Sequence, residues 1–195
     1  VNELSNTRQL QNMVKLAELG DPVAEELQRE RGRSAVFLSS EAGSSDASSA
    51  ANALAKQRQA SERALNDYQS GLNQLLESAD FDETVRSSIN TFERHIEELE
   101  GLRQQIDNRD IGGAGSASQY TGFIMEIVNR VPLLVRRATD PELARQINGY
   151  FALAEAAEMS GRERAAGAGL VRSGDFDLPS VGQISALAGR QDAYL

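Results

Sequence analysis

Apolar residues recur at alternating spacings of three and four along most of the 195-residue chain, and this spacing places side chains on one face of an α-helix. The spacing is most regular over residues 51–75 and 85–106, and it returns over 120–134 and 147–168. No convincing run alternates at every second residue, as a half-buried β-strand would. The pattern predicts an all-α fold, an elongated antiparallel bundle of about six helices based on a four-helix bundle. We expect residues 1–195 to form one domain, and the periodicity leaves open whether it is one bundle or two stacked end to end.

Glycine, proline and capping residues predict where these helices begin and end. A first helix is expected to be interrupted near Gly20, to restart at Asp21-Pro22 and to run to about Ser39. Residues 39–46 then form a flexible connection in which Asp46 is a candidate N-cap. Downstream we expect a turn at residues 78–80 and a helix end at the glycines of 112–115. The next helix should kink or end early at Pro132. A fifth helix is expected from Asp140-Pro141 to about Arg172, and a short sixth helix from Ser180 to the C-terminus.

Four arginines occupy stripe positions where a bundle helix should present a core residue: Arg31, Arg58, Arg103 and Arg164. Arg29 and Arg33 lie off the stripe of Arg31, so only Arg31 of these three is expected to point inward. A buried charge costs on the order of several kcal/mol unless an ionic partner compensates it. The four arginines therefore need partners, and those partners define the candidate chemistry.

Two interpretations of these arginines are open. A guanidinium group stays charged at physiological pH and presents a planar fork of donors, so paired arginines suit a small planar oxyanion. Small residues border Arg31 and Arg164 and leave room for such a ligand: Gly32, Ser34, Gly161, Ala165 and Gly167. In the other interpretation the arginines pair with internal glutamates, or extend their charged ends to solvent. Glu30, Glu158 and Glu163 are the candidate internal partners.

Composition narrows the function further. The net charge of −9 and the pI near 4.7 argue against a nucleic-acid partner or an acidic membrane surface. The chain has no cysteine and one histidine, His95, which lacks the Glu-x-x-His context of a di-metal bundle and suits a rim position better than a metal ligand. The glycines of 112–115 lack the Gly-Lys-Ser/Thr of a phosphate loop. We therefore expect no enzyme, no cofactor and no metal site.

Several short motifs in the chain occur together in one known family. They are Leu27-Gln28-x-Glu30-Arg31-Gly32-x-Ser34, Gln57-Arg58 with Ser61-Glu62, Leu102-Arg103 with Ile106-Asp107, Tyr120-Thr121, Glu163-Arg164-Ala165, and the closing Gln191-x-Ala193-Tyr194-Leu195. With these motifs the chain, from about Leu27 onward, resembles the nitrate- and nitrite-sensing (NIT) domain. That domain occurs in bacterial sensor histidine kinases, chemoreceptors, cyclases and a transcription antiterminator.

The resemblance implies an all-helical fold whose ligand lies between helices and is held by the arginines of the two Glu-Arg motifs. These arginines correspond to Arg31 and Arg164 here, while Arg58 and Arg103 match motif positions whose role is less defined. With Gly32 and Ser34 they form the candidate ligand-binding set. Two departures from the family pattern bear on ligand preference: Pro132 interrupts a helix that the family usually continues, and Ser61-Glu62 stands where Thr-Asp is more usual.

The favoured function is a sensor that binds nitrate or nitrite and passes a helix displacement to an output domain outside this chain. No apolar run approaches the roughly 20 residues that span a bilayer. We nevertheless expect an extracytoplasmic, periplasmic domain of an inner-membrane chemoreceptor or sensor kinase. It would form a homodimer and be flanked by membrane helices and a cytoplasmic signalling domain. A cytoplasmic protein with a fused C-terminal domain is the alternative location. The alternative function is a helical interaction module without a small-molecule ligand.

Overall fold

A computed structural model describes residues 2–130, 156 and 158–162 of the chain. All the elements of these residues are α-helices, which confirms the predicted fold class. They are α1 (Asn2–Ser39), α2 (Ser45–Ser78), α3 (Glu83–Ile96), α4 (Leu99–Asp107) and α5 (Gly113–Val128), and residues 158–162 are also helical.

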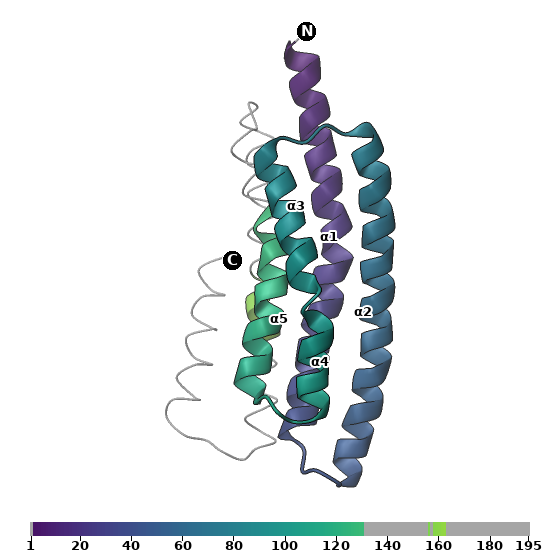
Figure 1. The fold of residues 1–195 in the computed structure, drawn as a ribbon, viewed down its shortest axis with the longest axis vertical. Coiled ribbons are helices and arrows are strands. Elements are labelled where there is room, and N and C mark those ends of the chain that lie inside the picture. Colours follow the sequence, from purple (N-terminus) through teal and green to yellow (C-terminus); the bar gives the residue numbers. More distant parts are fainter. Residues whose placement is uncertain (1, 131–155, 157, 163–195) are drawn as a thin grey trace.

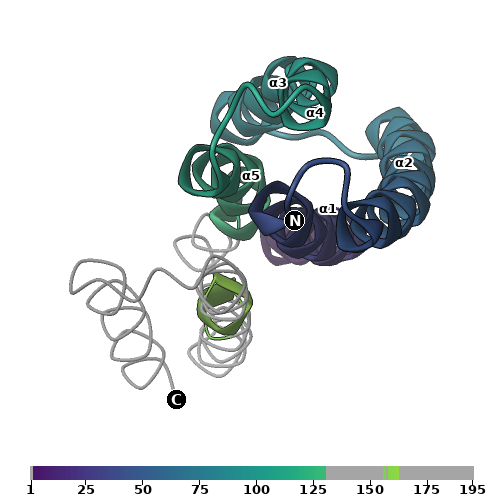
Figure 2. The ribbon, with the colours of Figure 1, turned by 90° about the horizontal axis from the view of Figure 1, so that it is seen from below.

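The helices run along one long axis (Figure 1). The long helices α1 and α2 form an antiparallel pair, and α3 and α4 follow each other along one side of the bundle. Seen along the axis, α1, α2, the α3–α4 pair and α5 enclose a common interior (Figure 2). Residues 158–162 lie outside this ring, on the other side of α1 and α5. Helix α1 therefore has neighbours on two sides.

Apolar side chains from every helix fill the interior of the ring. The most buried are Val23, Leu27, Leu72, Phe92, Leu102, Ile106, Tyr120, Phe123 and Ile124. The stripe predicted over residues 85–106 is buried as expected, but it belongs to two helices, because α3 ends at Ile96 and α4 begins at Leu99. Helix α3 begins after Asp82, whose side chain accepts a hydrogen bond of 3.0 Å from the Val85 backbone.

The predicted interruption near Gly20 is wrong, since α1 continues through Gly20 and Pro22. Gly20 serves a packing role instead, because a Cβ atom there would lie 2.5 Å from Cγ2 of Ile127 on α5. The absence of a side chain lets α1 and α5 approach each other closely. Pro22 has no backbone N–H and so costs α1 one helical hydrogen bond. Burial of Val23 and Leu27 on the same helix stabilises the fold against this cost.

The connection between α1 and α2 differs from the prediction in its cap. Helix α1 ends at Ser39 as predicted, but Ser44 is the N-cap of α2, and its hydroxyl accepts a hydrogen bond of 3.0 Å from the Ala47 backbone. Asp46 lies in the first turn, where its carboxylate interacts favourably with the helix dipole. The predictions for Pro132, the start and end of the fifth helix, the sixth helix and Arg164 fall outside the described residues.

Candidate functional site

Two adjacent charged residues of α1, Glu30 and Arg31, are fully buried, with exposed fractions of 0% and 1%. Successive residues on an α-helix point about 100° apart, so the two side chains enter different surroundings. Glu30 points into the ring toward α4 and α5, whereas Arg31 contacts α5 and the helix of residues 158–162. The inward position predicted for Arg31 is confirmed, and Arg29 and Arg33 are exposed as expected.

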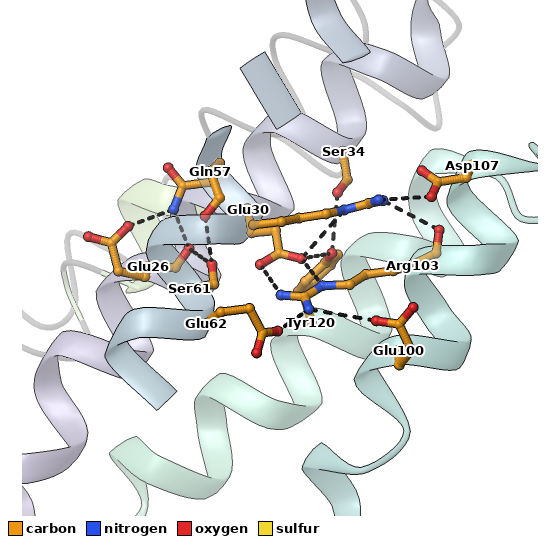
Figure 3. A network of polar contacts seen from close by, with 11 residues as sticks. Glu26, Glu30, Ser34, Gln57, Ser61, Glu62, Glu100, Arg103, Asp107 and Tyr120 are labelled. Atoms are coloured by element: carbon orange, nitrogen blue, oxygen red, sulfur yellow. Dashed lines mark hydrogen bonds and ion pairs between the residues drawn. The ribbon is translucent and has the colours of Figure 1, made fainter. Parts of the chain in front are cut away.

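Inside the ring, Glu30 is the centre of an ion-pair network (Figure 3). Arg103 of α4 binds the Glu30 carboxylate with both ends of its fork, through Nε to Oε1 at 2.7 Å and Nη2 to Oε2 at 3.0 Å. The Tyr120 hydroxyl donates to Oε1 of Glu30 at 2.8 Å. Arg103 also donates to Glu62 of α2. The network thus joins α1, α2, α4 and α5 through one buried carboxylate.

Arg58 extends this network toward the surface. Its Nη1 donates to Oδ2 of Asp107 at 2.9 Å and its Nη2 to the Arg103 carbonyl oxygen at 3.3 Å, while its Nε lies 3.9 Å from Oε1 of Glu30. Arg103 also lies 3.9 Å from Oε2 of Glu100, so Arg58 and Arg103 face four carboxylates, those of Glu30, Glu62, Glu100 and Asp107. A further anion placed here would meet a surplus of negative charge.

The environment also sets proton affinities in this network. Burial lowers the pKa of Arg103, but hydrogen bonds and charge from Glu30 and Glu62 outweigh burial and raise this pKa above its ordinary value. Burial raises the pKa of Tyr120, and the negative charge of Glu30 raises it further. Arg103 thus stays charged and Tyr120 stays neutral as a hydrogen-bond donor.

On the other side of α1, Arg31 meets a different set of groups. Its Nη1 donates to Oε1 of Glu158 at 2.6 Å and to the Thr121 hydroxyl at 2.9 Å, and its Nη2 lies 3.5 Å from Oε2 of Glu158. Glu158 is 0% exposed and also accepts from Gln28 Nε2 and from Arg162 Nε, each at 2.8 Å. One buried carboxylate therefore receives donors from α1 and from its own helix.

The described residues of this second cluster carry more positive than negative charge. Among its described members, Arg31 and Arg162 are cationic and only Glu158 is anionic, which leaves one positive charge. Arg31 Nε is buried and has no hydrogen-bond partner among the described residues, although buried donors are nearly always paired. The helix of residues 158–162 also lies close, because a Cβ atom on Gly161 would be 2.9 Å from Arg31 Nη2.

The structure separates the candidate residues of the sequence analysis into two places. Arg58 and Arg103 lie in the ring network, and Ser34 joins them through a 3.4 Å hydrogen bond from its hydroxyl to that of Tyr120. Arg31 lies in the outer cluster. Gly32 has no close neighbour in the described part of the chain, since a Cβ atom there would meet nothing within 4 Å. Arg164 is outside the described residues.

Three residues that surround Arg31 were not predicted as site residues: Gln28, Thr121 and Glu158. The signal for the first two was present, because Gln28 belongs to the motif of Arg31 and Thr121 follows Tyr120 in another motif. Adjacent residues on α5 in fact serve the two clusters, with Tyr120 on Glu30 and Thr121 on Arg31. Glu158 appeared only as a possible internal partner of an arginine.

A further buried arginine was also missed. Arg130, 4% exposed, donates through Nη1 to the Tyr68 hydroxyl at 2.7 Å and lies over the rings of Tyr68 and Phe92, 5.5 Å and 5.2 Å from their centroids. It lies one residue before a stripe position, so periodicity gave no reason to select it.

The described residues form an all-helical bundle with a buried guanidinium group between α1, α5 and the helix of residues 158–162. A family profile described as nitrate and nitrite sensing matches residues 22–195. The chain belongs to this nitrate- and nitrite-sensing family, and the recognition made from the motifs is confirmed.

Two known proteins place the chain within longer relatives. The nitrate regulatory protein of Klebsiella oxytoca is 26% identical over 101 residues, which make up 51% of this chain and 26% of that protein. The solved structure of the NasR transcription antiterminator matches 97% of this chain and 50% of its own chain, with a TM-score of 0.84 and 22% identity. The second match shows a shared fold. The chain thus spans about a quarter of one relative and half of the other.

The prediction of an extracytoplasmic domain of a membrane receptor is wrong. The proteins that the chain matches are a nitrate regulatory protein and a transcription antiterminator, whereas the prediction required membrane receptors. Within the described residues, no helix combines the length and hydropathy that a membrane crossing needs. The predicted exclusion of nucleic-acid partners is not supported either, because one matched protein is a transcription antiterminator.

Proposed function

We propose that the domain binds nitrate or nitrite beside Arg31, between α1 and the helix of residues 158–162, with Arg164 as the second arginine of the clamp. Binding displaces that helix, and an output domain outside this chain reads the displacement. The proposal includes no catalytic step. It leaves Arg58 and Arg103 as structural members of the ring network, because carboxylates already neutralise them.

The observation that carries the proposal is the surplus positive charge at a buried guanidinium. Arg31 is 1% exposed, its Nε lacks a partner in the described part of the chain, and the described charges around it sum to one positive charge. A monovalent planar oxyanion neutralises this charge and accepts from the forked donors in one plane. A tetrahedral dianion such as sulfate fits neither the single charge nor the planar geometry.

The relatives suggest the output. The name of one relative describes nitrate regulation, and the name of the other describes transcription antitermination. An output that acts on gene expression is therefore the proposal for the full-length protein. The condition for signalling is that the anion binds one helix arrangement more tightly than the other.

The test is nitrate calorimetry on single-arginine variants. Arg31→Ala and Arg164→Ala should each abolish measurable binding, because each removes one of two charge-assisted donor forks worth roughly 1.5–3 kcal/mol per hydrogen bond. Arg31→Lys keeps the charge but loses the fork, so its binding should be weak. Circular dichroism confirms that each variant is folded before titration.

Arg29→Ala and Arg33→Ala are matched controls on the exposed face of the same helix and should bind like the parent. Arg29 pairs only with Glu25 and Glu26 among the described residues, and its side chain is 57% exposed. If both Arg31 variants keep the parental affinity, the proposed clamp is refuted.

Thermal melting separates the sensor from the alternative interaction module. A sensor is stabilised saturably by nitrate or nitrite at constant ionic strength, following ligand linkage. An interaction module responds to nitrate, nitrite, sulfate and chloride only through general salt effects.

We also propose a homodimer, the commonest oligomer geometry. The sequence offers Leu10, Val14 and Ala17 as a contact stripe on α1, but Ala17 is buried in the core and does not face a partner. Sedimentation that stays monomeric at high protein concentration, with and without nitrate, would contradict it.

A further inference from the structure

We propose that Glu158 is a tethered competitor of the anion. In the ligand-free protein the Glu158 carboxylate pairs with the Arg31 guanidinium, which is the group that the anion binds. Release of Glu158 from Arg31 therefore sets the affinity for the anion. The same release moves the helix of residues 158–162, which carries Glu158. This inference rests on the proposed function and assigns the group that regulates the site.

The contacts of Glu158 resemble those expected of the ligand. A carboxylate is planar and singly charged, as nitrate and nitrite are. Its two oxygens face the two terminal nitrogens of Arg31, with Oε1 2.6 Å from Nη1 and Oε2 3.5 Å from Nη2. The second contact is at the limit of a hydrogen bond, so Glu158 satisfies this fork incompletely. An anion free to orient itself can satisfy the fork better.

Glu158 also has a partner that can leave with it. Arg162, one turn later on the same helix, donates from Nε to Oε1 of Glu158 at 2.8 Å, and its side chain is 19% exposed. Release from Arg31 therefore does not leave the carboxylate as an unpaired buried charge, which would be strongly destabilising. Among the described charges, ligand binding converts a cluster of two cations and one anion into two neutral pairs, Arg31 with the ligand and Arg162 with Glu158.

The close approach of the helix couples this exchange to movement. A Cβ atom on Gly161 would lie 2.9 Å from Arg31 Nη2, so the helix backbone already lies against the guanidinium. Arg31 and its remaining partner Thr121 belong to α1 and α5, whereas Glu158 and Gly161 belong to the helix of residues 158–162. An anion that takes the place of Glu158 therefore moves this helix relative to α1 and α5.

The first measurement is nitrate calorimetry on Glu158→Gln in the full chain. Glutamine keeps the size of the side chain but removes the competing charge, so the nitrate Kd should fall roughly tenfold or more. Glu62→Gln is the control, because it removes the same charge from the ring network on the other side of α1. An unchanged or higher Kd in Glu158→Gln overturns the inference while the proposed function stands. Absence of nitrate binding to the wild type overturns both.

The second measurement separates a tethered competitor from a merely nearby negative charge. The chain has no cysteine, so Lys56→Cys on α2 and Ser160→Cys give a unique pair of spin-label sites. Nitrate should shift the label distance in the parent. Ligand-free Glu158→Gln should already show a distance shifted toward the nitrate-bound one, because the contact that holds the helix on Arg31 has been weakened. A ligand-free distance equal to that of the parent would overturn the inference.

Arg162→Met supplies a variant with the opposite expected effect. Without Arg162, a released Glu158 loses its counter-ion and competes more strongly for Arg31, so the nitrate Kd should rise. The ligand-free label distance should stay parental, because Arg31 still holds Glu158. A distance already shifted in ligand-free Arg162→Met would contradict the role given to Arg31 in holding the helix.

Discussion

Replacing Glu30 by glutamine tests whether the ring network stabilises the bundle as a set of buried ion pairs. The substitution preserves the shape of a side chain that is 0% exposed and removes its charge. Arg103, whose side chain is 7% exposed, then loses the carboxylate that it binds at 2.7 and 3.0 Å. Its remaining carboxylate hydrogen bond among the described residues is to Glu62, whose side chain is 51% exposed.

Removing one partner of a buried ion pair leaves the other charge buried and uncompensated, which costs about 3–5 kcal/mol in the free energy of unfolding. A chain of this size loses about 2–4 °C in Tm for each kcal/mol. The Tm of Glu30→Gln should therefore fall by roughly 6–20 °C. Urea unfolding followed by circular dichroism gives the free energy directly.

Arg29→Ala is the matched control, because its pairs with Glu25 and Glu26 are on the surface. Exposed pairs contribute about 0–1 kcal/mol, so its loss should be small and should shrink with added salt. The double variant Glu30→Gln/Arg103→Met should lose less than the sum of the two single variants, because the second change removes the orphaned charge. Two results would refute the description of a buried, coupled network. One is a decrease of less than about 1 kcal/mol in the free energy of unfolding of Glu30→Gln. The other is strict additivity of the two changes in the double variant.

Two further predictions concern packing and pH. Gly20→Ala places a Cβ atom 2.5 Å from Cγ2 of Ile127 and should lower the free energy of unfolding in urea by about 1–3 kcal/mol. Gly101→Ala is the control, because a Cβ atom there meets nothing within 4 Å among the described residues, and it should be neutral or stabilising by up to about 1 kcal/mol. Equal effects at both positions would contradict the close approach of α1 and α5. The pKa of Tyr120 is raised by burial and by Glu30, while a tyrosine in the unfolded chain ionises near pH 10, about its ordinary pKa. The stability from neutral Tyr120 is therefore full below about pH 10 and declines as the pH rises further. Above about pH 10 the free energy of unfolding should fall less steeply with pH in Tyr120→Phe than in the parent. Equal slopes in the two proteins would contradict a raised pKa of Tyr120.

Features that depend on the spacing of residues along the chain could be predicted before the structure. The three/four recurrence of apolar residues fixed the all-α class and the stripe of α3–α4, because a helix must bury one face wherever it packs. The same spacing placed Arg31 inside and left Arg29 and Arg33 outside. The paired motifs identified the family, since they record which residue types stand at fixed positions.

The tertiary structure decided which buried residues meet. Periodicity describes one face of a helix, but α1 is covered on two sides, so Glu30 and Arg31 are both buried although they point in different directions. Periodicity therefore gave Arg31 and Arg103 the same kind of position, yet one pairs with Glu158 outside the ring and the other with Glu30 inside it. Gly20 shows the same limit, because a glycine that stops a helix and one that admits a neighbouring helix look alike until the neighbour, Ile127, is in place. Contacts between residues far apart in the chain depend on how whole helices are arranged, and a spacing along one helix carries no information about that arrangement.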